Sequence, residues 1–286
     1  MPEVDKNDHP EVAPHGAVLK FDQVDLRFED VVAMENISFE MLAGETRVIL
    51  GSSGSGKTTL LKTALGLLKP DKGRVFLYGR DITDLKEREL FQLRSKVGVL
   101  FQEGGLFDSM TVADNVAYPL VNRTSGPLQI DEIDAKVREA LRFVELEQTV
   151  DKFPSELSGG MRRRVGIARA VVTEPPLVLY DSPTAGLDPI TANTIMALIA
   201  KERDITNTAN LIITHRYQDG QLMANFRYNP QSGHLEPASH NGTDGGQQKS
   251  TVFMVMEQGR LVFEGSQSEL ESSGDEYVSK FVLRRQ

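Results

Sequence analysis

A glycine-rich segment at positions 51–58, GSSGSGKT, constrains the fold of this chain more than any other feature of the sequence. It follows the apolar run Thr46–Leu50 and precedes an apolar stretch at 60–65, which is the pattern of a strand, a tight loop and a helix start. Glycines let backbone N–H groups converge on one anion without Cβ clashes, and the helix N-terminus adds partial positive charge. The segment therefore predicts a phosphate-binding loop in an α/β fold.

Two side chains of this loop carry the chemistry expected of a nucleotide site. Lys57 supplies a full positive charge for the β- and γ-phosphates, and Thr58 supplies a hydroxyl for Mg²⁺. The alternative is a chance glycine-rich turn, but a random match to GxxxxGK[ST] in a chain of this length has a probability on the order of 1%. The residues expected to contact the nucleotide are Gly51, Ser52, Ser53, Gly54, Ser55, Gly56, Lys57, Thr58 and Thr59.

Other short apolar runs surround the loop and predict a sheet. They lie at 17–28, 37–40, 97–101, 177–180 and 211–213. With helical stretches between them, such runs favour a largely parallel sheet that is buried on both faces. Apolar positions at helical spacing over about 103–165 predict an inserted helical subdomain, and the pattern at 252–263 predicts a β-hairpin. We expect a flexible N-terminus at 1–15, one domain over 16–270 and a tail at 271–286.

Composition excludes several classes of protein. Of the 286 residues, 40% are hydrophobic and 26% charged, which is ordinary for a globular chain with a sizeable core. A formal net charge of −9 argues against nucleic acid as a partner, and the absence of Cys excludes a disulfide framework. The N-terminal residues lack a signal-peptide pattern, and no apolar run reaches the ~18 residues needed to span a bilayer. We therefore expect other chains to supply any membrane spans.

A second glycine-containing segment, LSGGM at 157–161, gives the chain its resemblance to a family. Ser158 before a helical stretch is an ordinary N-cap, and a capped helix start with two glycines is also an anion site. Together with the phosphate loop, the segment resembles the signature motif of ABC-type ATPases. The resemblance implies a RecA-like P-loop NTPase core with an antiparallel β-subdomain and an inserted helical subdomain. It also implies ATP and Mg²⁺, bound between the phosphate loop of one copy and Ser158, Gly159 and Gly160 of a second.

The same resemblance gives roles to five further residues, in chain order. Phe28 would stack on adenine, although a core Phe is nearly as common there. Gln102 would reach Mg²⁺ and the attacking water, and Asp181 would be the Mg²⁺-linked carboxylate. Asp188 lies in a loop that crosses the dimer interface, and His215 would sense the γ-phosphate. The run Arg162–Arg164 after the signature is either a solvated helix face or a set of phosphate ligands.

Narrower features resemble one branch of that family. The segments FQEGGLF at 101–107 and DNVAYPL at 114–120, with Met161 ending the signature, look like the Mla-type ATPases of lipid transport. This implies integral-membrane permease partners, an MCE-domain lipid-binding protein reached through the permease, and lipid cargo. It places the chain on the cytoplasmic face of a bacterial inner membrane, because the permease would hold it there.

One residue departs from the family pattern. Ser182 stands directly after Asp181, where the family places the Glu that polarises the attacking water. A neutral hydroxyl cannot act as that base and can only orient water. Three explanations stay open: compensation by His215 or Glu103, use of ATP mainly as a conformational ligand, or an introduced change. Slow hydrolysis is expected.

A polar stretch at 229–250 also exceeds the spacing expected between His215 and the next strand. It is either a tolerated surface insertion or a contact with a partner or the second ATPase copy. Its His234 and His240 are too isolated to suggest a metal site.

Three alternative functions differ in kind from the transport motor. A nucleotide-gated regulatory subunit with little turnover fits Ser182. A soluble ABC protein of DNA repair or translation would usually carry two fused ATPase units or a long coiled coil. A P-loop kinase would not need the LSGGM segment.

Overall fold

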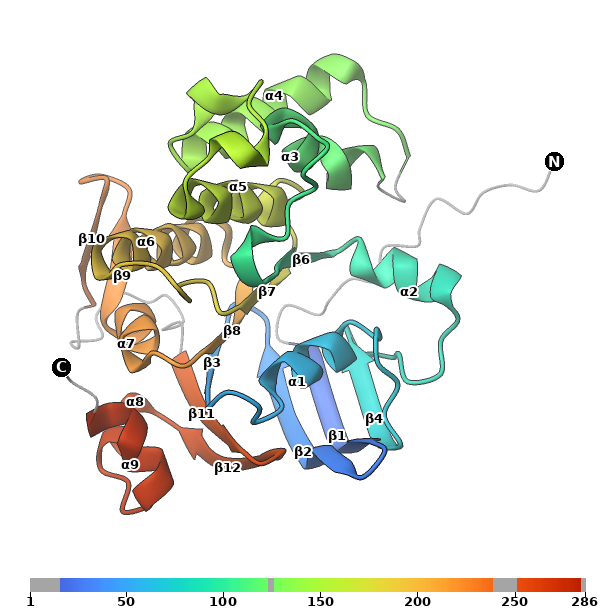
Figure 1. Ribbon diagram of the computed structural model, residues 1–286, viewed down its shortest axis with the longest axis vertical. Helices are drawn as coiled ribbons and strands as arrows, with labels where there is room; N and C mark the ends of the chain where they lie inside the picture. Colours follow the sequence, from blue (N-terminus) through green and yellow to red (C-terminus); the bar gives the residue numbers. More distant parts are fainter. Residues whose placement is uncertain (1–15, 123–125, 239–250, 284–286) are drawn as a thin grey trace.

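The computed structural model describes residues 16–122, 126–238 and 251–283 (Figure 1). The predicted flexible segment 1–15 and positions 239–250 of the polar stretch, His240 included, lie outside these residues. A six-stranded sheet forms the centre of the fold. Its strands, in spatial order, are β12 (Arg260–Gly265), β11 (Thr251–Glu257), β3 (Thr46–Leu50), β8 (Ala209–Thr214), β7 (Leu177–Asp181) and β6 (Val97–Leu100).

Five neighbouring strands of this sheet are parallel and mostly apolar on both faces, as the sequence predicts. β11, β3, β8, β7 and β6 pair in parallel, and β12 closes one edge as the antiparallel arm of a hairpin. Alternate residues enter different cores: Ile212 belongs to one cluster and its neighbours Leu211 and Ile213 to the other. Burial on two faces explains why these strands are continuous apolar runs.

A four-stranded antiparallel sheet covers one of these faces. Its order is β2 (Val31–Leu42), β1 (Ala17–Phe28), β4 (Lys72–Leu77) and β5 (Arg80–Asp81). Phe21 and Phe39 stack across the β1–β2 pair with ring centroids 5.0 Å apart, within the cluster that also holds Leu60 and Leu61. The antiparallel β-subdomain expected from the family resemblance is therefore present.

Helices cover the rest of the sheet. They are α1 (Lys57–Ala64), α2 (Glu87–Arg94), α3 (Val112–Val121), α4 (Ile130–Phe143), α5 (Gly159–Val171), α6 (Pro189–Thr206), α7 (Tyr217–Asn225), α8 (Gln267–Glu271) and α9 (Glu276–Leu283), with short 3₁₀ turns at Gln102–Gly104, Glu147–Thr149 and Pro154–Glu156. Figure 1 shows α3 and α4 together above α5, at the far end from β1, β2 and β4. These helices occupy the predicted subdomain region, and α5 continues past 165 to Val171. α9 lies beyond the predicted domain boundary at 270, yet its Val278 is 1% exposed in the same core.

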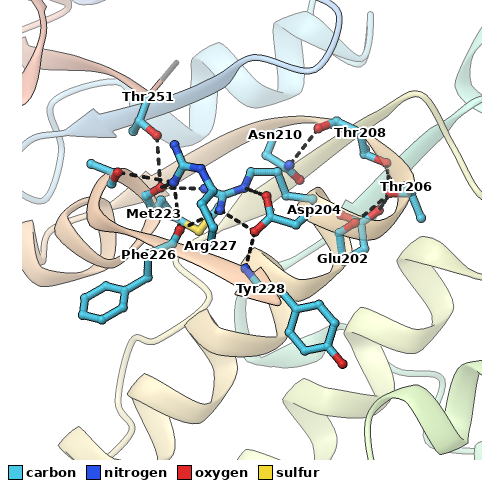
Figure 2. A network of polar contacts seen from close by, with 12 residues as sticks. Glu202, Asp204, Thr206, Thr208, Asn210, Met223, Phe226, Arg227, Tyr228 and Thr251 are labelled. Carbon is cyan, nitrogen blue, oxygen red and sulfur yellow. Dashed lines mark hydrogen bonds and ion pairs between the residues drawn. The ribbon is translucent and has the colours of Figure 1, made fainter. Parts of the chain in front are cut away.

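Residues 226–237, which include the start of the polar stretch at 229–250, form a small hairpin of β9 (Phe226–Asn229) and β10 (His234–Pro237). A buried ion pair anchors it to α6. The Arg203 guanidinium pairs with Asp204 at 2.8 Å and donates to the carbonyl oxygens of Met223 and Phe226. Asp204 in turn accepts the backbone N–H of Tyr228 at 2.7 Å (Figure 2). The hairpin is thus fixed to the core through its backbone.

Within the described residues, no helix is both long and apolar enough to cross a bilayer.

Candidate nucleotide site

The carboxyl ends of four parallel strands meet at one edge of the central sheet. Leu50 of β3 is level with Thr214 of β8, Ile213 with Asp181 of β7, and Tyr180 with Leu100 of β6. The segments that follow these strands therefore share this edge. They carry the phosphate loop, His215, Ser182 and Gln102. Ligands bind in this position in open α/β sheets.

The phosphate loop is folded around its own lysine. Lys57 Nζ donates to the carbonyl oxygens of Gly51 at 2.9 Å and Ser52 at 2.7 Å, and to Ser55 Oγ at 3.0 Å. Burial lowers the pKa of Lys57, and the carboxylate of Asp181 opposes this effect. A Cβ at position 51 would lie 2.6 Å from the Met256 carbonyl, so glycine is required there. Ser52, Ser53 and Gly54 form an exposed rim.

The two side chains expected to hold Mg²⁺ are in contact. Thr58 Oγ1, at the start of α1, donates to Asp181 Oδ2 at the end of β7 at 3.2 Å. They are 123 positions apart in the chain, and the fold brings them together at the sheet edge. A hydroxyl and a carboxylate are hard oxygen ligands, which suit Mg²⁺ when it also binds substrate phosphates. The donor set therefore fits the metal. When bound, Mg²⁺ would supply charge that offsets the phosphates.

Ser182 is held from three sides. Its Oγ donates to Asp181 Oδ1 at 3.2 Å, and its N–H donates to the carbonyl of Ile213 at 2.8 Å. Its own carbonyl accepts from Arg163 at 2.8 Å. The backbone here has φ +50°, in the left-handed region that non-glycine residues seldom adopt. The hydroxyl is directed at a neighbouring carboxylate and is no general base.

A buried carboxylate joins the loops that follow β7 and β8. Asp219 Oδ2 accepts from Thr184 Oγ1 and from Thr214 Oγ1, both at 2.6 Å. All three side chains are at most 2% exposed. Burial raises the pKa of Asp219, against the two hydroxyl hydrogen bonds and the charge of Arg216. Asp219 thus fixes the segment after Ser182 to the segment that carries His215.

The remaining predicted residues of this edge are exposed. Gln102 begins the 3₁₀ turn after β6, and His215 follows β8; both side chains face solvent. The side chain of Glu103 lies outside the described part. Phe28, at the β1–β2 turn, is 46% exposed, so the alternative of a core Phe is wrong.

The signature residues and Asp188 form a second surface. Ser158 caps α5 by accepting the N–H of Met161 at 3.2 Å, as its sequence context predicts. Asp188 caps α6, and hydrogen bonds from Thr191 lower its pKa. A Cβ at Gly160 would lie 2.6 Å from Thr191 Cγ2, so the second glycine allows the starts of α5 and α6 to approach.

The three arginines after the signature each donate to a backbone carbonyl. Arg162 donates to the carbonyl of Leu157, and Arg164 to that of Val144. Arg163 is 3% exposed and donates to the carbonyls of Ser182 at 2.8 Å and Ala185 at 3.0 Å. The burial of Arg163 excludes a solvated position for it, and Arg162 and Arg164 are half-buried and each bond one backbone carbonyl.

Comparison with known proteins decides the family. The family described as "ABC transporter" matches residues 34–185, over half of the chain, including the phosphate loop, Gln102, the signature and Asp181. This chain belongs to the ABC transporter family. The prediction of an ABC-type ATPase is thereby confirmed, and the relatives and solved structures that follow confirm the resemblance to the Mla type and the fold.

Curated relatives of this ABC protein carry several transport names. It is 39% identical over 202 residues to the probable ribonucleotide transport ATP-binding protein mkl of Mycobacterium leprae, covering 71% of this chain and 58% of that protein. It is 37% identical to the intermembrane phospholipid transport ATP-binding protein MlaF of Haemophilus influenzae, covering 70% and 75%. It is 42% identical to the methionine import protein MetN of Carboxydothermus hydrogenoformans, covering 65% and 54%. The chain spans little more than half the length of the mycobacterial relatives.

Solved structures agree on the fold. The cassette MJ0796, in a dimeric post-hydrolysis state with ADP and Pi, has a TM-score of 0.72 at 28% identity, covering 87% of this chain and 98% of that one. The cbiO1 protein from Clostridium perfringens, part of the transporter complex cbiONQ, has a TM-score of 0.73 at 28% identity, covering 94% and 93%.

Two residues beside the predicted site of this ABC protein have structural roles that the sequence did not indicate. Arg163 of α5 and Asp219 of α7 both fix the loop after β7. Arg163 belongs to a run that reads as surface charge, and Asp219 is an ordinary acidic residue early in a helix. Their roles depend on contacts between distant segments, and no local pattern signals them.

Proposed function

We propose that this chain is the ATP-binding and ATP-hydrolysing subunit of a membrane transporter. Lys57 and the loop amides would hold the phosphates, Thr58, Gln102 and Asp181 would hold Mg²⁺, and His215 would sense the γ-phosphate. The observation that carries the proposal is the contact between Thr58 Oγ1 and Asp181 Oδ2 at 3.2 Å, beside the loop whose backbone carbonyls bond Lys57 Nζ. A hydroxyl and a carboxylate so placed are what a Mg-nucleotide requires.

A second copy of the chain would complete each site. Ser158 and Gly159 are exposed at the capped start of α5, where N–H groups can receive a phosphate. Nearby, Ile190 is 80% exposed in the first turn of α6, two residues after Asp188. An exposed apolar residue next to an anion site supports an interface with a second copy of the chain, and the dimeric form of MJ0796 supports the same arrangement.

A groove next to Gln102 supports a permease partner. It is lined by exposed aromatic side chains from three segments: Phe91, Phe101, Phe107 and Tyr118. Phe107 and Tyr118 lie with ring centroids 4.7 Å apart, and the Arg169 guanidinium lies 5.6 Å from the Phe107 ring centroid. An apolar groove of this kind suits the apolar side of a short helix. The complex that contains cbiO1 also supports membrane partners.

The permease proposal is tested by affinity capture from detergent-solubilised membranes of the host. The expected result is capture of an integral-membrane protein by the wild type and its loss with Phe107→Asp and Tyr118→Asp together. Val262→Asp, at an exposed apolar position on β12, is the matched control and should retain the partner. Equal capture by the groove variant and the control would reject the groove as the docking site.

The proposed cargo is a phospholipid or another hydrophobic molecule moved between envelope membranes, with an MCE-domain protein reached through the permease. The segments 101–107 and 114–120 and the similarity to MlaF support it. The similarity to MetN supports methionine import instead. Mass spectrometry of small molecules retained by the captured complex distinguishes phospholipid from methionine.

Hydrolysis is proposed to be slow, because Ser182 offers no base. Loss of a general base typically lowers the rate ~10²–10⁴-fold, while the charged groups around the phosphates are retained. The test compares Mg-ATP turnover by the wild type, Ser182→Glu and a Lys57→Ala blank. Slow turnover above the blank, accelerated by Ser182→Glu, is expected. Wild-type turnover that Ser182→Glu does not accelerate would show that another group acts as the base.

Ser182 also favours one second candidate, a nucleotide-gated subunit that closes on ATP without turning over. Under that function the wild type would bind ATP yet match the Lys57→Ala blank in hydrolysis, while Ser182→Glu would turn over. Binding measured with a fluorescent ATP analogue separates this outcome from a chain that does not bind nucleotide.

A further inference from the structure

The C-terminal helix α9 places one side chain on the phosphate loop. The hydroxyl of Tyr277, in the first turn of α9, lies 3.2 Å from the backbone N of Ser52 and 3.1 Å from Ser52 Oγ. It also lies 3.3 Å from the carbonyl oxygen of Met256, near the end of β11. One hydroxyl thus joins the second residue of the loop to the neighbouring strand.

The chemistry of these groups assigns each hydrogen bond. A phenol hydroxyl donates one proton and accepts through two lone pairs. The Met256 carbonyl can only accept and the Ser52 N–H can only donate, so Tyr277 donates to the first and accepts from the second. The remaining lone pair of Tyr277 faces the Ser52 hydroxyl. Substitution by Phe would keep the ring and remove all three contacts.

The helix that carries Tyr277 is itself firmly held. Asp275 Oδ1 caps it by accepting the N–H groups of Tyr277 at 2.8 Å and Val278 at 3.0 Å. Val278 is 1% exposed in the core, and the ring of Phe281 packs edge-on against that of Tyr277 at 5.4 Å. The phenol is therefore a fixed support for the loop.

We infer that Tyr277 is a positioning residue for nucleotide binding, and this inference rests on the proposed function of the loop. A loop with glycines at 51, 54 and 56 has many conformations to lose when it closes on phosphates. Lys57 holds the inner side of the loop, and Tyr277 holds Ser52 on its exposed rim. Restricting the loop in advance lowers the entropy lost on binding. The contact supports ground state and transition state equally, so it acts on ATP affinity and not on kcat.

The test measures the Kd of a fluorescent ATP analogue, together with KM and kcat for Mg-ATP, on the full chain. Tyr277→Phe is expected to weaken binding about fivefold, the change made by one ordinary hydrogen bond, with kcat within about twofold of wild type. Ser52→Ala, which removes one of the three contacts, should weaken binding about twofold in the wild type. It should have no further effect in the Tyr277→Phe background.

Tyr78→Phe is the matched control. The Tyr78 hydroxyl donates to the carbonyl of Lys96 at 2.7 Å in a part of the fold away from the loop, so its loss affects stability without affecting ATP affinity. Tyr277→Phe with wild-type Kd and KM would overturn the inference while leaving the proposed function intact. If the wild type binds no better than Lys57→Ala, the proposed function fails and the inference fails with it.

Coupling between sites is reciprocal, which gives a second measurement. If Tyr277 supports the loop, Mg-ATP must in return stabilise α9. Amide hydrogen exchange over 276–283 should slow when Mg-ATP binds to the wild type, and this slowing should be lost in Tyr277→Phe at saturating nucleotide. A merely structural tyrosine would leave the nucleotide-dependent change in place, which would contradict the inference.

Discussion

Replacing Asp219 by Ala tests whether one buried carboxylate holds the two loops behind the nucleotide site. The change leaves the hydroxyls of Thr184 and Thr214 without their acceptor, and both side chains are at most 1% exposed. An unsatisfied buried polar group costs about 1–3 kcal/mol, so two of them cost about 2–6 kcal/mol. Part of this is offset because the burial of the carboxylate is itself unfavourable, as its raised pKa shows. We expect a loss of about 3 kcal/mol in the free energy of unfolding.

That loss corresponds to a fall of about 6–12 °C in Tm for a domain of this size. It is measured by urea unfolding and by thermal melts followed by circular dichroism, without nucleotide. Asp219→Asn is the matched control, because an amide oxygen can still accept from both hydroxyls, and it should lose about 1 kcal/mol. A loss below about 1 kcal/mol for Asp219→Ala, or equal losses for the two variants, would refute the reasoning. Turnover should fall with Asp219→Ala, because Ser182 and His215 follow the two strands that this carboxylate joins.

The remaining predictions concern pH, the anchored hairpin and the loop before α3. Burial raises the pKa of Asp219 above its unfolded value near 4. The contribution of Asp219 to stability is therefore full below that unfolded value and is lost as pH rises through the folded pKa. Urea unfolding between pH 4 and 7 should show the wild type losing stability relative to Asp219→Asn. Arg203→Met should destabilise by about 3 kcal/mol in urea titrations, since it removes the guanidinium that pairs with Asp204 and bonds the carbonyls of Met223 and Phe226. Asn115→Leu should lower the free energy of unfolding by about 3 kcal/mol in the same assay, because the buried Asn115 amide makes four hydrogen bonds to the backbone of the segment 107–111. An Arg203→Met or Asn115→Leu variant as stable as the wild type would contradict the role given to that residue.

The sequence was sufficient for the elements whose signals are local. Thr46–Leu50 followed by GSSGSGKT predicts a strand, a loop and a helix, and all three are present. Apolar runs predict the parallel sheet because strands buried on two faces cannot alternate polar and apolar residues. The family resemblance assigned Gln102, Asp181 and His215 to one site, and in the structure they lie at the ends of the adjacent strands β6, β7 and β8.

The supports of the site were beyond prediction because their signals are not local. Arg163, Asp219 and Tyr277 bond groups that lie 19, 35 and 225 positions away in the chain. Each acts on a backbone or on a hydroxyl, and such partners place no requirement on the residue type at the other end. A backbone carbonyl accepts from any donor, so nothing at Ser182 or Ala185 signals an arginine. The family pattern predicts which residues contact the nucleotide, and only the fold shows which residues hold them in place.

Ser182, which stands where the family has Glu, shows how residues that hold the backbone affect function. Arg163 and Ile213 hold the backbone at position 182 through its carbonyl and its N–H, and neither contact involves the side chain. The position that the family gives to a glutamate is therefore kept in place although the glutamate is absent. Because these backbone contacts do not involve the side chain at position 182, Ser182→Glu can introduce a carboxylate without rebuilding the loop. Arg163→Met should then reduce turnover in the Ser182→Glu background, whereas Arg164→Met, which releases only the Val144 carbonyl, should affect stability alone. Equal turnover by the two arginine variants in the Ser182→Glu background would mean that the position of residue 182 does not depend on Arg163.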